Sequence, residues 1–225
     1  MKVLLFGASG MVGRGVLLEC LEDGWVDAVL AVGRASCNVT HPKLRELIRS
    51  DFHDYRDARP ELAGHEACFF CLGVSSAGMD EASYSRVTLD FTVAAAEVLA
   101  ELNPGMTFCY VSGEGTDSTE RGRAMWARVK GKTENRLLGM RLNAYMFRPG
   151  YIQPRKGVRS KTLLYQAFYT VLGPLYPLLK RVMPRHVTAT ENVGRAMIEV
   201  AAKGYSKRIL ENPDINALAG FSSTR

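Results

Sequence analysis

The sequence lacks the features of several protein classes. Its five cysteines, at positions 20, 37, 68, 71 and 109, are odd in number and follow no framework spacing, which argues against a disulfide scaffold. Cys68 and Cys71 form a CxxC pair within "ACFFCLG", which is typical of a buried strand. Residues three apart on a strand point to opposite faces, so we expect neither a metal site nor a redox pair there. The apolar start "MKVLLFGASG" is too short for a signal peptide, and we expect a cytoplasmic protein.

A recognisable nucleic-acid-binding motif is also missing. The net charge is +6 and the isoelectric point is about 9.1, with basic residues crowded from Arg121 to Arg141 and from Arg155 to Lys161. This balance suits an anionic small molecule, a nucleic acid or an anionic membrane surface, and a charge run is most often a solvated face. Because charge is the only nucleic-acid signal, we expect no nucleic-acid partner.

One stretch without any charge approaches the length of a membrane span. It is "TLLYQAFYTVLGPLYPLL", Thr162 to Leu179. Gly173, Pro174 and Pro177 interrupt it, and it contains three tyrosines. We interpret it as a buried helix of a small lobe or as a lid over a site, with contact to a membrane surface as the less favoured alternative.

Short apolar runs alternate with longer amphipathic segments along the first two thirds of the chain. We expect strands at Val3–Phe6, Ala28–Gly33, Ile48–Phe52, Ala67–Gly73, Met106–Ser112 and Ala144–Gly150. We expect helices at Val12–Glu22, Asp80–Leu102 and Arg123–Leu138, and a further helix opened by a capping box at Thr188–Glu191. The pattern predicts an α/β fold with a Rossmann-like doubly wound parallel sheet. We expect one domain over residues 1–225, in which 151–225 form a small C-terminal lobe for substrate binding or closure.

Three glycines follow the first expected strand. In "VLLFGASGMVGRG" they are Gly7, Gly10 and Gly13, placed between a strand and an amphipathic helix. The first permits a tight turn, the second lets backbone amides approach a pyrophosphate, and the third lets the helix pack closely on the strand. The helix N-terminus then favours an anion. The sequence predicts a dinucleotide-binding turn made of Gly7, Ala8, Ser9, Gly10, Met11, Val12 and Gly13, with a purely structural turn as the alternative.

The end of the second strand indicates which dinucleotide is bound. NAD-binding proteins usually have an acidic residue there, whereas NADP-binding proteins have an arginine. This strand ends at Gly33-Arg34, and no Asp or Glu follows before Glu46. A guanidinium can bind a 2′-phosphate that a carboxylate would repel. We therefore predict NADP in preference to NAD, with Arg34 as the contact and Arg14 as the candidate for a second cation.

The glycine turn and five later motifs together resemble those of an atypical short-chain dehydrogenase/reductase. The motifs are "SDF" at 50–52, "CLGVS" at 71–75, Ser112 at a strand end, Lys130, and "RPGYI" at 148–152. The resemblance covers residues 1–200 and is nearest to the small NAD(P)-dependent epimerase/dehydratase-like and Tat-interacting-protein-like members. It implies that Ser112 and Lys130 are catalytic. The implied cofactor contacts are Asp51 and Phe52 at the adenine, Leu72, Gly73 and Val74 at the ribose, Lys130 at the ribose hydroxyls, and Pro149 and Gly150 at the nicotinamide.

One residue departs from the family motif. In "MWARVKGK" position 126 is Trp, whereas the family has the proton-transferring Tyr four residues before the Lys. An indole N–H donates a hydrogen bond but does not titrate usefully, so acid–base catalysis worth about 10² to 10⁴ would be lost. We name Tyr151 as the first candidate for a substitute and Glu114 as the second. A packing role for Tyr151 and a solvated loop position for Glu114 remain alternatives.

Two functions are consistent with these residues. The first is an NADP-dependent oxidoreductase or epimerase acting on a small carbonyl or hydroxyl substrate of unknown identity. The second is a non-catalytic NADP(H) sensor that binds a protein partner.

Overall fold

The sheet that organises the molecule is parallel throughout. The structure, a computed structural model, describes residues 1–158 and 176–222. The main sheet has the strand order β3-β2-β1-β4-β5-β6-β9. Its strands are β1 (Lys2–Phe6), β2 (Ala28–Gly33), β3 (Leu44–Ile48), β4 (Ala67–Phe70), β5 (Thr107–Val111), β6 (Asn143–Arg148) and β9 (Ile209–Glu211). The Rossmann-like parallel fold expected from the sequence is confirmed.

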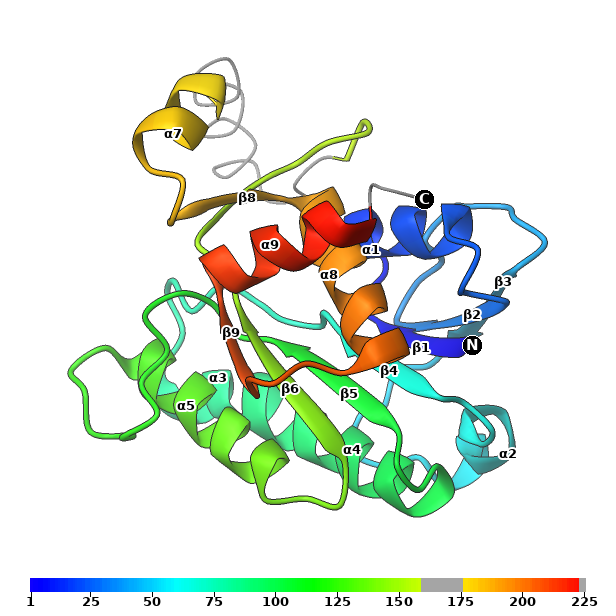
Figure 1. The fold of residues 1–225 in the computed structure, drawn as a ribbon. Coiled ribbons are helices and arrows are strands. Elements are labelled where there is room, and N and C mark those ends of the chain that lie inside the picture. The colour runs from blue at the N-terminus through cyan, green and yellow to red at the C-terminus, as the bar shows by residue number, and fades with distance from the viewer. Residues whose placement is uncertain (159–175, 223–225) are drawn as a thin grey trace.

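Helices cover both faces of this sheet (Figure 1). On one face lie α1 (Met11–Glu22), α8 (Thr190–Lys203) and α9 (Asn212–Ser222). On the other face lie η1 (Arg56–Ala58), α2 (Arg59–Leu62), α3 (Glu81–Ser85), α4 (Phe91–Leu102) and α5 (Met125–Leu138). A π-helical turn, η2 (Arg86–Asp90), joins α3 to α4. Two separate apolar cores result, one on each face of the sheet.

The strands are apolar along their whole length because both faces are covered. In β4, Ala67 and Phe69 belong to the core beneath α1 and α8, whereas Cys68 and Phe70 belong to the core beneath α4 and α5. Cys71 packs with the first of these cores, so Cys68 and Cys71 lie on opposite faces. All five thiols are free. Within 1–158 and 176–222 no cluster of three or more potential ligands forms a metal site.

Two local expectations were wrong, and a third was right only in part. β3 begins at Leu44 instead of Ile48, and the apolar Phe52 lies in the core after the strand. The expected helix over 80–102 is interrupted by the π turn, although Asp80 caps its start by accepting a bond from Ser83 N at 2.9 Å. The expected capping box does not form. Thr188 lies in strand β8 and its hydroxyl donates to Asn216 Oδ1 at 2.7 Å, so α8 begins two residues later without a side-chain cap.

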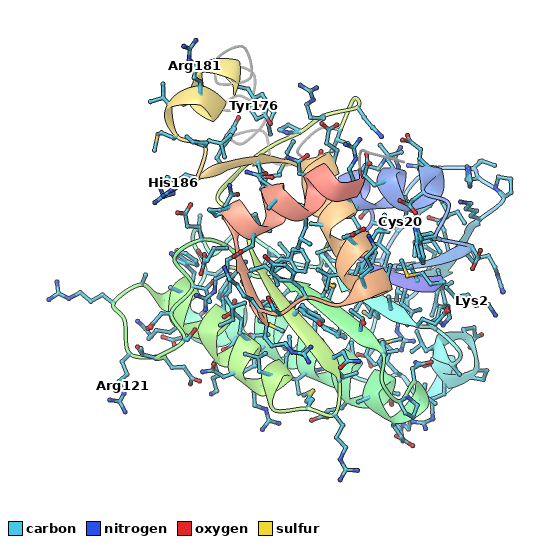
Figure 2. All side chains as sticks on the ribbon, viewed as in Figure 1. Lys2, Cys20, Arg121, Tyr176, Arg181 and His186 are labelled. Atoms are coloured by element: carbon cyan, nitrogen blue, oxygen red, sulfur yellow. The ribbon has the colours of Figure 1, made fainter. Side chains whose placement is uncertain are left out.

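A small region stands apart from the main sheet. Here β7 (Tyr151–Gln153) pairs in parallel with β8 (Val187–Ala189), and α7 (Tyr176–Val182) lies beside them. Figure 2 shows Tyr176 and Arg181 on this helix. Most of the uncharged stretch at 162–179 falls outside the described residues. In the part that is described, no helix is long and apolar enough to cross a membrane.

The residues after β8 return to the main sheet. β9 pairs with β6, and α8 packs along α1, where a Cβ added at Gly194 would lie 2.9 Å from the Cβ of Glu19. The buried Glu19 carboxylate forms ion pairs with Lys156 at 2.6 Å and with Arg195 at 2.9 Å. The stretch 151–225 therefore supplies both the small region and the last part of the main core. A substrate-binding or lid role for it stays a prediction.

Candidate functional site

A cavity of about 390 Å³ opens where the strand order of the main sheet reverses. The chain runs from β1 outward to β3 and then returns to β4 on the other side, and such a switch point leaves a crevice at the carboxyl ends of the strands. The cavity is lined by Gly10, Met11, Val12, Cys71, Leu72, Gly73, Val74, Ser75, Val111, Ser112, Gly113, Lys130, Pro149, Gly150 and Ile152. It therefore brings together residues from all the motifs except "SDF" and the end of the second strand.

The glycine turn forms one wall of the cavity. Gly7 has φ +81°, and a Cβ there would lie 2.7 Å from Leu72 N. A Cβ at Gly13 would lie 2.2 Å from Gly7 O, so the turn and the start of α1 require glycine. Gly10, at the N-cap, has no side-chain cap, and Met11 and Val12 of the first turn line the cavity. The uncapped N-terminus of α1 thus faces the space where a phosphate is expected.

Ala8 and Ser9 of the same turn do not line the cavity. Ala8 is buried in the core beneath α1. Asp51 and Phe52 also lie away from it. The Phe52 ring is 1% exposed and packs 5.7 Å from the Phe91 ring, and the Asp51 carboxylate accepts a bond from His53 N at 2.8 Å. Their predicted adenine contacts stay predictions.

The loop after β2 is held by one arginine and one carboxylate, Arg14 and Glu46. Arg34 is exposed, and Arg14 donates to the Cys37 carbonyl. The Glu46 carboxylate accepts bonds from Ser36 Oγ at 2.8 Å and Cys37 N at 2.7 Å. An acid therefore lies beside this loop although it is distant in sequence. The register of β2 and β3, which pairs Ala31 with Glu46, accounts for the proximity.

Ser112 is held by a buried ion pair. Its Oγ lies 2.5 Å from Glu134 Oε1 and 3.1 Å from Phe147 O. Glu134 is fully buried, and Arg148 donates to it through Nε at 3.0 Å and through Nη2 at 2.5 Å. Both neighbours of the hydroxyl accept hydrogen bonds, and a hydroxyl has one proton. In this arrangement Ser112 can offer a substrate only a lone pair.

Glu134 was not identified as a site residue from the sequence. It follows Lys130 by four residues on α5, which places the two side chains on one face of the helix. This spacing is the sequence signal that could have indicated Glu134.

Lys130 lines the cavity, as expected, and is partly buried. Its ammonium group donates to the carbonyl oxygen of Ser112. Across residues 1–158 and 176–222, no carboxylate lies within ion-pair distance of it. Burial lowers the pKa of Lys130 to about 8, and the charge of Glu134 partly opposes that shift.

Trp126 and the two candidates for a substitute proton donor, Tyr151 and Glu114, do not line the cavity. The Trp126 ring lies against the loop after β5, where a Cβ at Gly115 would be 3.4 Å from it. The Tyr151 hydroxyl donates to Gln153 Oε1 at 2.8 Å, and burial raises the pKa of Tyr151. Glu114 pairs with His186 Nδ1, a residue 72 positions away that no sequence signal indicated. Figure 2 shows His186 just before β8.

A second cavity, of about 570 Å³, lies between α8, α9 and the segment before β8. None of the predicted site residues lines it. Two of its charged lining residues are engaged elsewhere, since Arg195 pairs with Glu19 at 2.9 Å and Glu191 with Arg155 at 3.8 Å. We assign no function to it.

The solved structures with the same Rossmann-like fold include short-chain dehydrogenase/reductases of the epimerase/dehydratase type. The chain resembles this class, including its Tat-interacting-protein-like members, as the sequence motifs indicated. No protein-family model matches the chain.

Two curated relatives support the resemblance. The protein HTATIP2 of Rattus norvegicus is 26% identical over 154 residues, which are 67% of this chain and 62% of the relative. Leucinostatins biosynthesis cluster protein T of Purpureocillium lilacinum is 28% identical over 141 residues, which are 61% of this chain and 51% of the relative. The matched part thus covers less than two thirds of the length of either relative.

Solved structures share the fold at low identity. The Bordetella bronchiseptica enzyme WbmF in complex with NAD⁺ has a TM-score of 0.66 and 17% identity, over 100% of this chain and 79% of that chain. The UDP-glucose 4-epimerase of Thermotoga maritima has a TM-score of 0.63 and 14% identity, over 99% of this chain and 83% of that chain. These similarities define the fold and leave the reaction open.

Proposed function

We propose that this protein is an NADP(H)-binding oxidoreductase or epimerase that acts on a small carbonyl or hydroxyl substrate. The observation that carries the proposal is the cavity at the switch point, which combines an uncapped helix N-terminus with Lys130. Its volume of about 390 Å³ lies in the range of small-molecule sites. Solved structures of the same fold include complexes with NAD⁺ and NADH, which supports a nicotinamide dinucleotide as the ligand.

The residues present fit such a cofactor. The backbone amides of Gly10, Met11 and Val12 would bind the pyrophosphate, and Leu72 to Val74 would lie along the ribose. Lys130 would bind the ribose hydroxyls, with Pro149 and Gly150 beside the nicotinamide. When bound, the nicotinamide supplies hydride transfer, and the protein supplies position and proton transfer.

We propose NADP in preference to NAD because Arg34 is exposed beside the loop after β2 and Arg14 is anchored to that loop. Glu46 argues against NADP, because a carboxylate would repel the 2′-phosphate. Hydrogen bonds from Cys37 lower the pKa of Glu46, which keeps it ionised, but its oxygens already accept bonds from Cys37 and Ser36.

Thermal unfolding in the presence of NADPH or NADH tests the cofactor choice. A ligand at about 100 times its dissociation constant adds roughly 2.7 kcal/mol, so NADPH should give the larger shift at equal concentration. Arg34→Ala should remove the difference, and Arg45→Ala, an exposed arginine on β3, is the matched control. Equal shifts for the two cofactors would overturn the choice of NADP. A larger shift with NADH that Glu46→Gln abolishes would assign this end of the site to Glu46 instead.

The non-catalytic NADP(H) sensor is the second candidate. It is favoured by Trp126 at the tyrosine position and by the engagement of the Ser112 hydroxyl with Glu134. A sensor would bind NADPH and transfer hydride to no member of a panel of small carbonyl compounds. Turnover that Ser112→Ala or Tyr151→Phe abolishes would support the enzyme.

We further propose a cytoplasmic location, which the five free thiols support. The partner of the enzyme is a small molecule, and we expect no nucleic acid.

A further inference from the structure

The missing tyrosine leaves open which group moves a proton in this cavity. Among the described residues that line the cavity, two side chains titrate, Cys71 and Lys130. Burial raises the pKa of Cys71 to about 12, so this thiol stays neutral and holds its proton near neutral pH. A proton that reaches a molecule in the cavity from a lining side chain therefore comes from Lys130.

The neighbouring candidates are engaged elsewhere. Ser112 directs its proton toward Glu134 or Phe147 O, and the Tyr151 hydroxyl donates to Gln153. The Glu114 carboxylate pairs with His186. The partners of these groups do not line the cavity; they are Glu134, Phe147, Gln153 and His186.

The surroundings of Lys130 leave its amine available. An ammonium has three N–H donors, and a single acceptor, the Ser112 carbonyl, lies within hydrogen-bond distance in the described part of the chain. Glu134 is the acid on the same helix face, but the Arg148 guanidinium binds both of its oxygens. The nearby negative charge is thus already neutralised, and burial disfavours the lysine cation. A general acid–base works best when its pKa lies near the working pH.

We propose that Lys130 is itself the acid–base residue of this site and moves the proton that a tyrosine moves in the related enzymes. The inference rests on the proposed oxidoreductase function. In oxidation of an alcohol, the hydroxyl proton passes to the neutral Lys130 amine. The carbon–hydrogen bond would break with its electron pair passing as hydride to a bound oxidised nicotinamide, and the carbonyl bond would form. In reduction, a bound reduced nicotinamide would supply hydride to the carbonyl carbon, and the Lys130 ammonium would give its proton to the oxygen.

The first test follows the Lys130 amine directly, without cofactor. The ¹³Cε resonance of Lys130 is assigned by its loss in Lys130→Arg and is titrated against pH. The expected midpoint is near pH 8, well below the value of about 10.4 for an ordinary lysine. The resonance of Lys132, which is exposed on the same helix, serves as the internal reference. A Lys130 midpoint in the ordinary range would overturn the proposal.

The second test separates proton transfer from ribose binding. Arginine keeps the positive charge but does not release a proton in this pH range. Lys130→Arg is therefore expected to bind NADP(H) within about tenfold of the wild type and to lose turnover by about 10² to 10⁴. Lys132→Arg, the matched control, is expected to keep both. Turnover by Lys130→Arg within a few fold of the wild type would leave Lys130 as a ribose ligand only.

The outcomes distinguish the inference from the function on which it rests. A wild-type protein that does not bind NADP(H) overturns the proposed function, whatever the titration of Lys130. A protein that binds NADP(H) and transfers no hydride overturns both the enzyme and this role of Lys130. A protein that turns over with an ordinary Lys130 midpoint overturns the inference alone.

Discussion

The two walls of the cavity are built in different ways. The wall made by β1, α1 and the loop after β4 presents backbone amides and glycines, with Gly7 and Gly13 packed against backbone atoms. The wall made by β5, α5 and β6 presents Lys130 and Ser112, and the buried pair of Glu134 and Arg148 holds the Ser112 hydroxyl. The first wall requires only that a few glycines are kept. In the second wall, a single substitution can remove a functional side-chain group. Trp126 lies on α5, the helix that carries Lys130, but does not line the cavity.

The largest effect on stability is expected from removing one member of the buried ion pair behind the second wall. Glu134→Gln leaves the Arg148 guanidinium, which is 12% exposed, without its buried partner. Removing one member of a buried pair typically costs about 3–5 kcal/mol. Urea unfolding should show a loss of this size. Glu97→Gln is the control, because Glu97 and Arg136 are both well exposed and 3.7 Å apart, and it should cost below about 0.5 kcal/mol. Equal losses in the two variants would contradict the structural role of Glu134.

A methyl group added at Gly13 tests the wall made of glycines and backbone amides. Gly13→Ala places a Cβ 2.2 Å from Gly7 O, and the turn must shift to accept it. Overpacking of this kind costs about 1–3 kcal/mol, and we expect NADP(H) affinity to fall by more than about tenfold. Fluorescence titration and thermal unfolding measure the two effects. Gly24→Ala, where a Cβ would meet no atom within 4 Å, should leave both unchanged. Unaltered cofactor affinity in Gly13→Ala would place the dinucleotide elsewhere.

On the wall of side chains, Lys130 should make the stability of the protein depend on pH. The pKa of Lys130 is lowered to about 8 from 10.5, so below pH 8 the folded protein carries a buried cation at a cost. Between these two values the unfolded chain binds more protons than the folded one, and stability rises with pH. Lys130→Met should therefore be more stable than the wild type at pH 7, by about 1–2 kcal/mol after loss of one hydrogen bond. The difference should close as the pH rises toward 10.5. Urea unfolding across this range checks it, and a constant difference would contradict the lowered pKa.

The smallest effect is expected at Trp126. Because Trp126 does not line the cavity, Trp126→Phe should change NADP(H) affinity and turnover by no more than about twofold, or 0.5 kcal/mol. Isothermal titration and a hydride-transfer assay measure this. A tenfold loss in either would place the indole in contact with cofactor or substrate.

The sheet and the glycine turn could be predicted because their signals are local. Apolar runs such as Ala28–Gly33 are buried on both faces, and Gly7, Gly10 and Gly13 act through neighbours close in sequence. The support of the second wall depends on contacts between distant segments. Glu134 meets Arg148 only when α5 packs beside β6, and Glu46 reaches Cys37 through strand register. Thr188 had the sequence of a helix cap, but tertiary pairing with β7 placed it in a strand.

The packing of α8 on α1 sets an order of events during synthesis. Glu19 and Arg195, which form an ion pair, are 176 positions apart. A nascent chain that has emerged as far as β6 has made the glycine turn and α1 but not α8, which packs against α1 at Gly15, Val16 and Glu19. This side of α1 gains its partner only when α8 has been made, because contacts of high sequence separation form late. The glycine turn is thus made well before the helix that completes the surroundings of α1.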